Sequence, residues 1–194
     1  MKLKSSVILF GIVLIGLSTY WKGFAQSSPP EVDLFSDLVP VVEDVVIIPV
    51  IVPNEVHPRT DDALYPEIID LRPQSYELAY GKVPNCSNAG FCREGWVQGY
   101  QIGTNGYANQ TFEELTARRE LDLENGTKAS ADSIQTVSLK DGTRALVLPW
   151  YGYAHPSATE VIFDRDGYRY VYAVIMADNQ YVIDLANSSL EATE

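Results

Sequence analysis

Residues 159–176, TEVIFDRDGYRYVYAVIM, decide the fold of this chain. The dipeptide Asp166-Gly167 stands between two runs of alternating apolar residues, and Asp-Gly in that position is a strong signal for a β-hairpin. The pattern predicts strands over Thr159–Phe163 and Tyr168–Met176. Both faces of the second strand become apolar toward its end, which is typical of a central strand covered on one side by a helix.

Further elements lie on both sides of this hairpin. A second Asp-Gly hairpin is predicted over residues 134–148, and alternation predicts earlier strands over 76–82 and 95–102. Asn179 is expected to cap a final helix that runs to Leu190, with a docking stripe of Val182, Leu185, Ala186 and Ser189.

One internal helix is expected between the strands. Thr111 and Glu114 form a capping box, strong helix formers continue to Leu123, and Asn125-Gly126 ends the helix. Glu113 and Glu114 precede Arg118 and Arg119, an order that favours the helix dipole and i,i+4 pairing. Because tight turns join neighbouring strands, we expect a mostly antiparallel sheet with helices on one face, an α+β fold covering residues 65–190. Residues 191–194 would be a tail.

Residues 26–64 differ in composition from the rest. Six prolines argue against any helix there. The β-branched run from Val45 to Val52 is too apolar for a free linker. Two interpretations follow: the segment lies extended on the domain, where proline is tolerated at an edge, or it is covered by a partner chain. If the partner is a second copy of the chain, the second interpretation predicts self-association through residues 39–53, which can be tested.

The N-terminus has the layout of a secretory signal peptide over residues 1–25. Lysines at 2 and 4 precede an apolar run, and Gly23-Phe24-Ala25 gives a cleavage site after Ala25. The alternative is an uncleaved membrane anchor, although the run is shorter than the roughly 20 residues that span a bilayer. Cleavage would remove three lysines and no acidic residue, taking the formal net charge from −12 to −15. So acidic a chain is repelled by nucleic acid, which we exclude as a partner.

Cys86 and Cys92 are the only cysteines. They stand six positions apart in a turn-rich loop of a chain expected to be exported, so a structural disulfide is predicted. The spacing is not Cys-x-x-Cys, which argues against a redox pair.

No metal or cofactor is expected. The two histidines, His57 and His155, are far apart, and zinc sites need three or four closely spaced ligands. The start of a calcium loop at Asp164 and Asp166 would place Ile175 where that loop requires its twelfth residue, Glu.

The segment Trp150–Pro156, WYGYAHP, is the strongest candidate for a binding surface. Its residues Trp150, Tyr151, Tyr153 and His155 would form a platform for a sugar ring, a peptide or a protein if exposed. If packed inward, they would be a corner of the core.

The second half resembles a bacterial extracytoplasmic domain family of unknown function, found in exported proteins and outside some anti-sigma factors. The resemblance rests on Gly-Thr-x-Ala-x-x-Leu-x-Trp at 142–150, Asp-Gly-Tyr-x-Tyr at 166–170 and Ala-Asn-Ser-Ser-Leu at 186–190. It implies a curved antiparallel sheet that holds a helix, and it transfers no catalytic residue.

These observations predict a secreted or periplasmic binding module that is not an enzyme. The first alternative is a hydrolase of envelope polymers, in which His155 would meet a carboxylate such as Asp164 or Glu160. The second is the structural module that self-associates through residues 39–53. The membrane would be a partner only through an uncleaved N-terminal segment.

Overall fold

The computed structural model describes residues 33–57, 62–86, 92–104, 106–126, 129–152 and 157–190. The predicted signal peptide, residues 1–25, and the tail 191–194 lie outside these ranges. The described elements are α1 (Val39–Glu43), β1 (Tyr65–Arg72), β2 (Ser75–Gly81), β3 (Arg93–Gln101), the 3-10 helix η1 (Gly106–Asn109), α2 (Phe112–Asn125), β4 (Gln135–Ser138), β5 (Arg144–Leu148), β6 (Ala158–Arg165), β7 (Tyr168–Ile175) and α3 (Asn179–Leu190).

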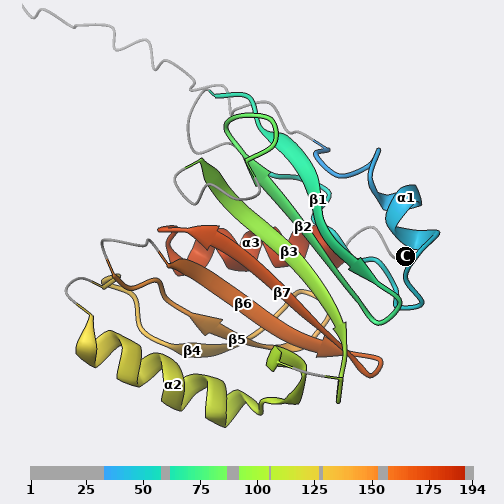
Figure 1. Ribbon diagram of the computed structural model, residues 1–194. Coiled ribbons are helices and arrows are strands. Elements are labelled where there is room, and N and C mark those ends of the chain that lie inside the picture. Colours follow the sequence, from blue (N-terminus) through green and yellow to red (C-terminus); the bar gives the residue numbers. More distant parts are fainter. Residues whose placement is uncertain are drawn as a thin grey trace, which may run out of the picture.

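The described strands form one curved sheet in the order β1-β2-β3-β7-β6-β5-β4, in which all neighbours are antiparallel (Figure 1). The chain runs through β1, β2 and β3, crosses to the far edge by way of η1 and α2, and returns through β4 to β7. The predicted α+β class and antiparallel sheet are confirmed.

The β6-β7 hairpin holds the centre of this sheet. Arg165 pairs with Tyr168, so Asp166 and Gly167 form a two-residue turn with φ values of 52° and 85°. Positive φ at both positions is the type I′ geometry that matches the twist of the flanking strands. β7 lies between β3 and β6, which confirms that it is a central strand.

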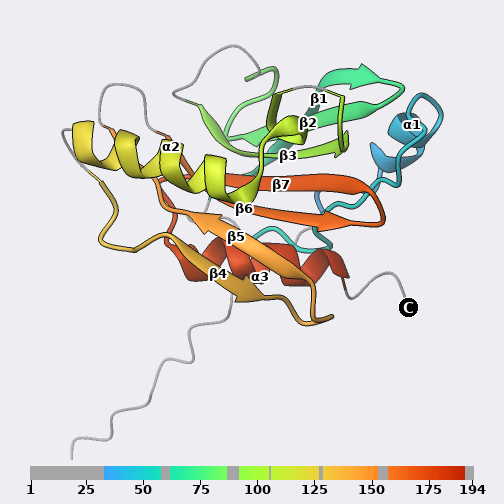
Figure 2. The same cartoon turned by 90° about the horizontal axis from the view of Figure 1, so that it is seen from below.

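The two long helices cover opposite faces of the sheet, as Figure 2 shows. Leu115 of α2 packs on Leu146, Ile162 and Val171, whereas Val182 and Leu185 of α3 belong to the core that includes Tyr172. The expectation of helices on one face was therefore wrong. The physical reason is that β7 is apolar on both sides, so each face needs its own cover.

The predicted helix signals are largely correct. At α2, Thr111 and Glu114 make both bonds of the capping box. The predicted stripe of α3 is buried. The cap of α3 is Asp178 rather than Asn179, because the Asp178 carboxylate accepts the amide of Tyr181 at 2.8 Å. Asn179 lies inside the helix, and its side-chain amide donates to the carbonyl of Ser133.

Residues 33–57, which we call the strap, pack across the face of the sheet that α3 also covers. The core on this face draws on residues on both sides of Tyr65, where the sequence placed the start of the folded domain. The strap contains α1, contrary to the expectation that proline excludes a helix. Pro40 lies in the first turn of α1, where its missing N–H costs nothing. The strap residues buried in this core are Leu34, Phe35, Val42, Val46, Ile48, Ile51 and Val56.

Tyrosine hydroxyls fix the backbone of the strap to the sheet. The Tyr76 hydroxyl donates to the carbonyl of Ile51 at 2.8 Å and accepts the Ile51 amide at 3.1 Å. Tyr172 donates to the same carbonyl at 3.1 Å, and Tyr170 donates to that of Pro49 at 3.2 Å. These bonds satisfy main-chain groups that no β-ladder pairs, which explains how an extended proline-containing segment is buried.

The predicted disulfide is present. Cys86 and Cys92 are bonded with a Cα–Cα distance of 5.8 Å and close the connection between β2 and β3. In the chain-entropy model a loop of this size stabilises the fold by roughly 2–3 kcal/mol.

Glycine at position 95 of β3 makes room for a tyrosine of β2. A Cβ atom there would lie 2.5 Å from the carbonyl oxygen of Ala173 and would collide with the Tyr80 hydroxyl. We expect Gly95→Ala to lower the free energy of unfolding by about 1–3 kcal/mol, the usual cost of overpacking a core. Chemical denaturation measures this directly, and an unchanged midpoint would show that the sheet accommodates the methyl group.

Candidate functional site

The predicted aromatic segment is described in part. Trp150 and Tyr151 follow β5 and are half-buried, whereas Tyr153 and His155 lie outside the described residues. The amide of Ser130 donates to the carbonyl of Trp150 at 3.0 Å, and the amide of Ser157 donates to that of Tyr151 at 3.3 Å. Tyr151 and Ser157, which stand before and after Tyr153 and His155 in the sequence, thus form a hydrogen-bonded pair.

Both members of that pair line a cavity of about 150 Å³ between α2 and the sheet, which we call the Glu160 cavity. Trp150 is not among its lining residues. The side chains used in the argument below are Trp96, Tyr107, Arg118, Arg119, Asp122, Tyr151 and Glu160.

Arg119 forms the inner wall of the cavity. Its side chain is only 6% exposed, and its Nη2 lies 3.0 Å from Oε2 of Glu160. Its Nη1 donates to the carbonyl oxygens that end β5 and begin β6: Leu148, Pro149 and Ala158. The prediction that Arg119 pairs with Glu113 or Glu114 along the helix is therefore wrong. Leu115 stands four positions before Arg119, and both lie on the face of α2 that meets the sheet.

Glu160 of β6 is the buried acid of the cavity. The Tyr107 hydroxyl donates to its Oε2 at 2.9 Å. Burial raises the pKa of the Glu160 carboxyl, while Arg119 and the Tyr107 hydrogen bond act in the opposite direction. Burial also raises the pKa of the Tyr107 phenol, and the neighbouring Glu160 charge adds to that increase.

Both described hydrogen bonds to Glu160 end on the same oxygen, Oε2. No donor in the described part of the chain reaches Oε1, and the side chain keeps 10% of its surface exposed. Oε1 is not one of the fully buried, unpaired side-chain atoms of the described residues, so this acceptor is accessible from the cavity. The cavity therefore offers an acceptor to whatever enters it.

Tyr151 closes the outer side of the cavity. The guanidinium of Arg119 lies 5.0 Å from the centre of the Tyr151 ring, within cation–π range. Burial raises the pKa of the Tyr151 phenol, and the neighbouring carboxylate of Asp122 adds to that increase. The ring is thus held in place while part of it stays exposed.

Asp164, the other carboxylate proposed for the hydrolase, is engaged elsewhere. Its two oxygens accept from Nε and Nη2 of Arg169 at 2.7 and 2.8 Å, a bidentate pair beside the N-terminus of α2. The structure therefore brings Tyr151 together with Glu160 but leaves Asp164 out of the cavity. Whether His155 reaches Glu160 remains a prediction, since that residue is outside the described ranges.

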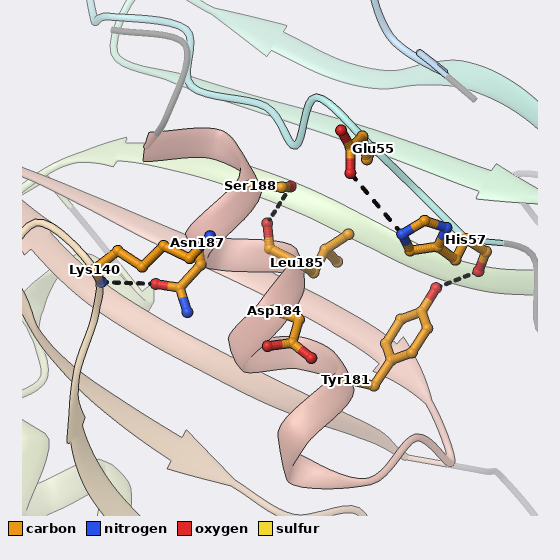
Figure 3. A pocket seen from close by; sticks show the side chains of 8 residues that line it. All are labelled: Glu55, His57, Lys140, Tyr181, Asp184, Leu185, Asn187 and Ser188. Carbon is orange, nitrogen blue, oxygen red and sulfur yellow. Dashed lines mark hydrogen bonds and ion pairs between the residues drawn. The ribbon is translucent and has the colours of Figure 1, made fainter. Parts of the chain in front are cut away.

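A second cavity, of about 310 Å³, lies between the end of the strap and α3 (Figure 3). The Tyr181 hydroxyl donates to the carbonyl of His57 at 2.5 Å, and the His57 ring lies 3.9 Å from the Glu55 carboxylate. The side chains of His57 and Glu55 are 49% and 40% exposed. None of the described residues that line this cavity is a buried acid or base of the kind that Glu160 provides, and its contacts fasten the end of the strap.

Sequence reasoning missed most of the Glu160 cavity, including Trp96, Tyr107, Arg118, Arg119 and Asp122. A signal was present in α2, where Leu115, Arg119 and Asp122 recur at the spacing of one helix face. The register of β3 against β7 and β6, which places Trp96 in the same row as Glu160, is visible only in the folded sheet.

Within the described ranges, no group of three or more histidine, cysteine, aspartate or glutamate side chains could hold a metal ion. No helix in the same residues has the length and apolar character needed to cross a membrane.

Comparisons of the chain with protein-family models, with curated proteins and with solved structures found no match.

Proposed function

We propose that this protein is an exported, non-enzymatic binding module that holds a small polar group of its ligand in the Glu160 cavity. The observation that carries the proposal is the open Oε1 of the nearly buried Glu160, flanked by partly exposed Tyr151. Binding sites combine apolar surface with a few fixed polar groups, and this cavity has both. Its small volume favours a terminal or side group of a larger ligand.

Export is part of the proposal. The Cys86–Cys92 disulfide supports it, because such bonds persist in oxidising compartments. The expected product begins at Gln26 and carries two hydrogens fewer than the reduced chain. N-terminal sequencing and intact mass of the protein from culture medium or periplasm test both points, and a full-length product with free thiols would contradict them.

A saturation-transfer NMR screen tests the binding itself. The probes are neutral oligosaccharides, free amino acids and short peptides at millimolar concentration, with the whole exported chain. We expect at least one probe to receive saturation, and Tyr151→Leu to abolish the transfer. Asp184→Asn, in the cavity beside the strap, is the matched control and should leave it intact. The proposal is refuted if no probe receives saturation, or if the transfer is the same in the parent chain and in Tyr151→Leu. Cleavage of a probe that Glu160→Gln abolishes would instead favour the hydrolase.

Self-association is the second candidate function, and the outer side of the strap favours it. Val41, Val45 and Ile47 are 49%, 45% and 69% exposed. Deleting residues 39–53 would also remove core residues, so surface substitutions are the cleaner test. If a second copy covers this side, Val45→Lys with Ile47→Lys should convert a dimer to a monomer in analytical ultracentrifugation. A monomer before the substitution would exclude this function.

A further inference from the structure

We infer that the Glu160 cavity selects an uncharged, hydroxyl-bearing sugar ring, whose hydroxyl donates to Glu160 Oε1 while its C–H surface lies against Trp96 and Tyr151. This inference rests on the proposed binding function and names the class of ligand. Three features of the cavity support it: its balance of charge, the guanidinium groups already placed on its aromatic rings, and the chemistry of its free hydrogen-bonding groups.

The formal charges of the described residues that line the cavity balance. Arg118, Arg119 and Asp122 of α2 line the same space as Glu160 of β6, and these four charges sum to zero. An ammonium group would meet the two guanidinium groups, and a carboxylate or phosphate would meet the open oxygen of Glu160. Like charges at short range in a partly buried site are unfavourable. A neutral ligand avoids both penalties.

The aromatic rings are not free to act as cation receptors. The guanidinium of Arg93 lies 5.7 Å from the centre of the Trp96 ring, and that of Arg119 lies 5.0 Å from the centre of the Tyr151 ring. Each ring therefore already has a cation from its own chain. What the partly exposed rings still offer is apolar surface with a polar rim, which suits the C–H face of a sugar.

Among the described residues, the cavity offers a free acceptor and a free donor. Glu160 Oε1 is an acceptor, and the guanidinium of Arg118, exposed on α2 at the rim, is a donor. A hydroxyl is both donor and acceptor, so neighbouring hydroxyls on one ring can satisfy the two groups together. Because Tyr107 and Arg119 hold Oε2, the acceptor position of Oε1 is set before the ligand arrives.

Tetrasaccharides matched in size and different in charge test this selection by isothermal titration calorimetry on the exported chain. The neutral probes are β-linked glucose, α-linked glucose and N-acetylglucosamine; the charged probes are β-linked glucosamine and galacturonate. We expect at least one neutral probe to bind ten times or more tightly than either charged probe. Glu160→Gln, which loses a charge-assisted bond, should weaken binding roughly tenfold. Arg118→Gln at the exposed rim should weaken it less and leave thermal stability unchanged.

The outcomes separate the two levels of the proposal. The sugar inference is overturned if a charged tetrasaccharide binds more tightly than the neutral ones, or if Glu160→Gln binds as tightly as the parent chain. Neither result contradicts the proposal that a ligand binds at the cavity. The sugar inference alone is also overturned if no sugar binds, but an amino acid or peptide binds and Tyr151→Leu abolishes that binding. If no probe of any class binds, both the inference and the proposed function are wrong.

Discussion

Replacing Val42 by aspartate is expected to lower the free energy of unfolding by more than about 4 kcal/mol, enough to unfold a large share of the protein. Val42 lies in α1 of the strap and is fully buried against the sheet. A carboxylate there would lose its hydration and find no partner, and the apolar contacts of the valine would also be lost. Urea denaturation followed by circular dichroism measures the change.

Val41 provides a control within the same turn. It is 49% exposed, so Val41→Asp introduces the same charge one residue away without burying it. We expect this variant to stay within about 0.5 kcal/mol of the parent chain. If residues 26–64 behaved as a linker, the two variants would be equally mild. Equal effects would therefore show that the strap does not belong to the core.

Replacing Arg119 by alanine is expected to cost about 3–5 kcal/mol of stability. The guanidinium is nearly buried and contacts Glu160 together with main-chain carbonyls at the ends of β5 and β6. Its removal leaves the Glu160 charge without its counter-ion. Arg119→Ala combined with Glu160→Gln should recover part of this loss, because the double variant no longer buries an unpaired carboxylate. Additive losses in the double-mutant cycle would show that the two side chains do not interact.

The pH dependence of stability gives an independent check on Glu160. Burial raises the pKa of its carboxyl in the folded protein above its value in the unfolded chain. Between these two values the folded state binds more protons, so the contribution of Glu160 to stability falls as pH rises through that window. The parent chain should therefore gain stability relative to Glu160→Gln as the pH is lowered through that window. If the stability of the parent chain relative to Glu160→Gln instead rises with pH, the pKa of Glu160 is not raised by folding.

Local chemistry explains why much of the fold followed from the sequence. Asp166-Gly167 can form a two-residue turn, Thr111 and Glu114 can close a capping box, and the apolar alternation of β7 points to a central strand. Each of these signals depends on residues a few positions apart. Burial of the strap depends on hydroxyls of tyrosines more than twenty residues away, such as Tyr76 and Tyr172. Proline content, which is a local signal, gave the wrong expectation for α1.

The candidate site was predictable only in part for the same reason. The aromatic segment was found because Trp150 and Tyr151 are adjacent in sequence. The groups that shape the cavity around Tyr151 come from β3, η1, α2 and β6, and they meet only after β7 has paired with β3 and β6. Arg119 carried the most misleading signal, because the acidic residues before it in the sequence suggested pairing along the helix, whereas its helix face is buried.

The location of the site has one direct test. Tryptophan labelled with ¹⁵N at the indole nitrogen distinguishes Trp96, inside the Glu160 cavity, from Trp150, outside it, in the chain that begins at Gln26. During titration with the tetrasaccharide that binds best, the Trp96 indole resonance should shift and saturate while that of Trp150 stays in place. Movement of Trp150 with Trp96 unchanged, or no movement of either, would contradict a binding site at Glu160.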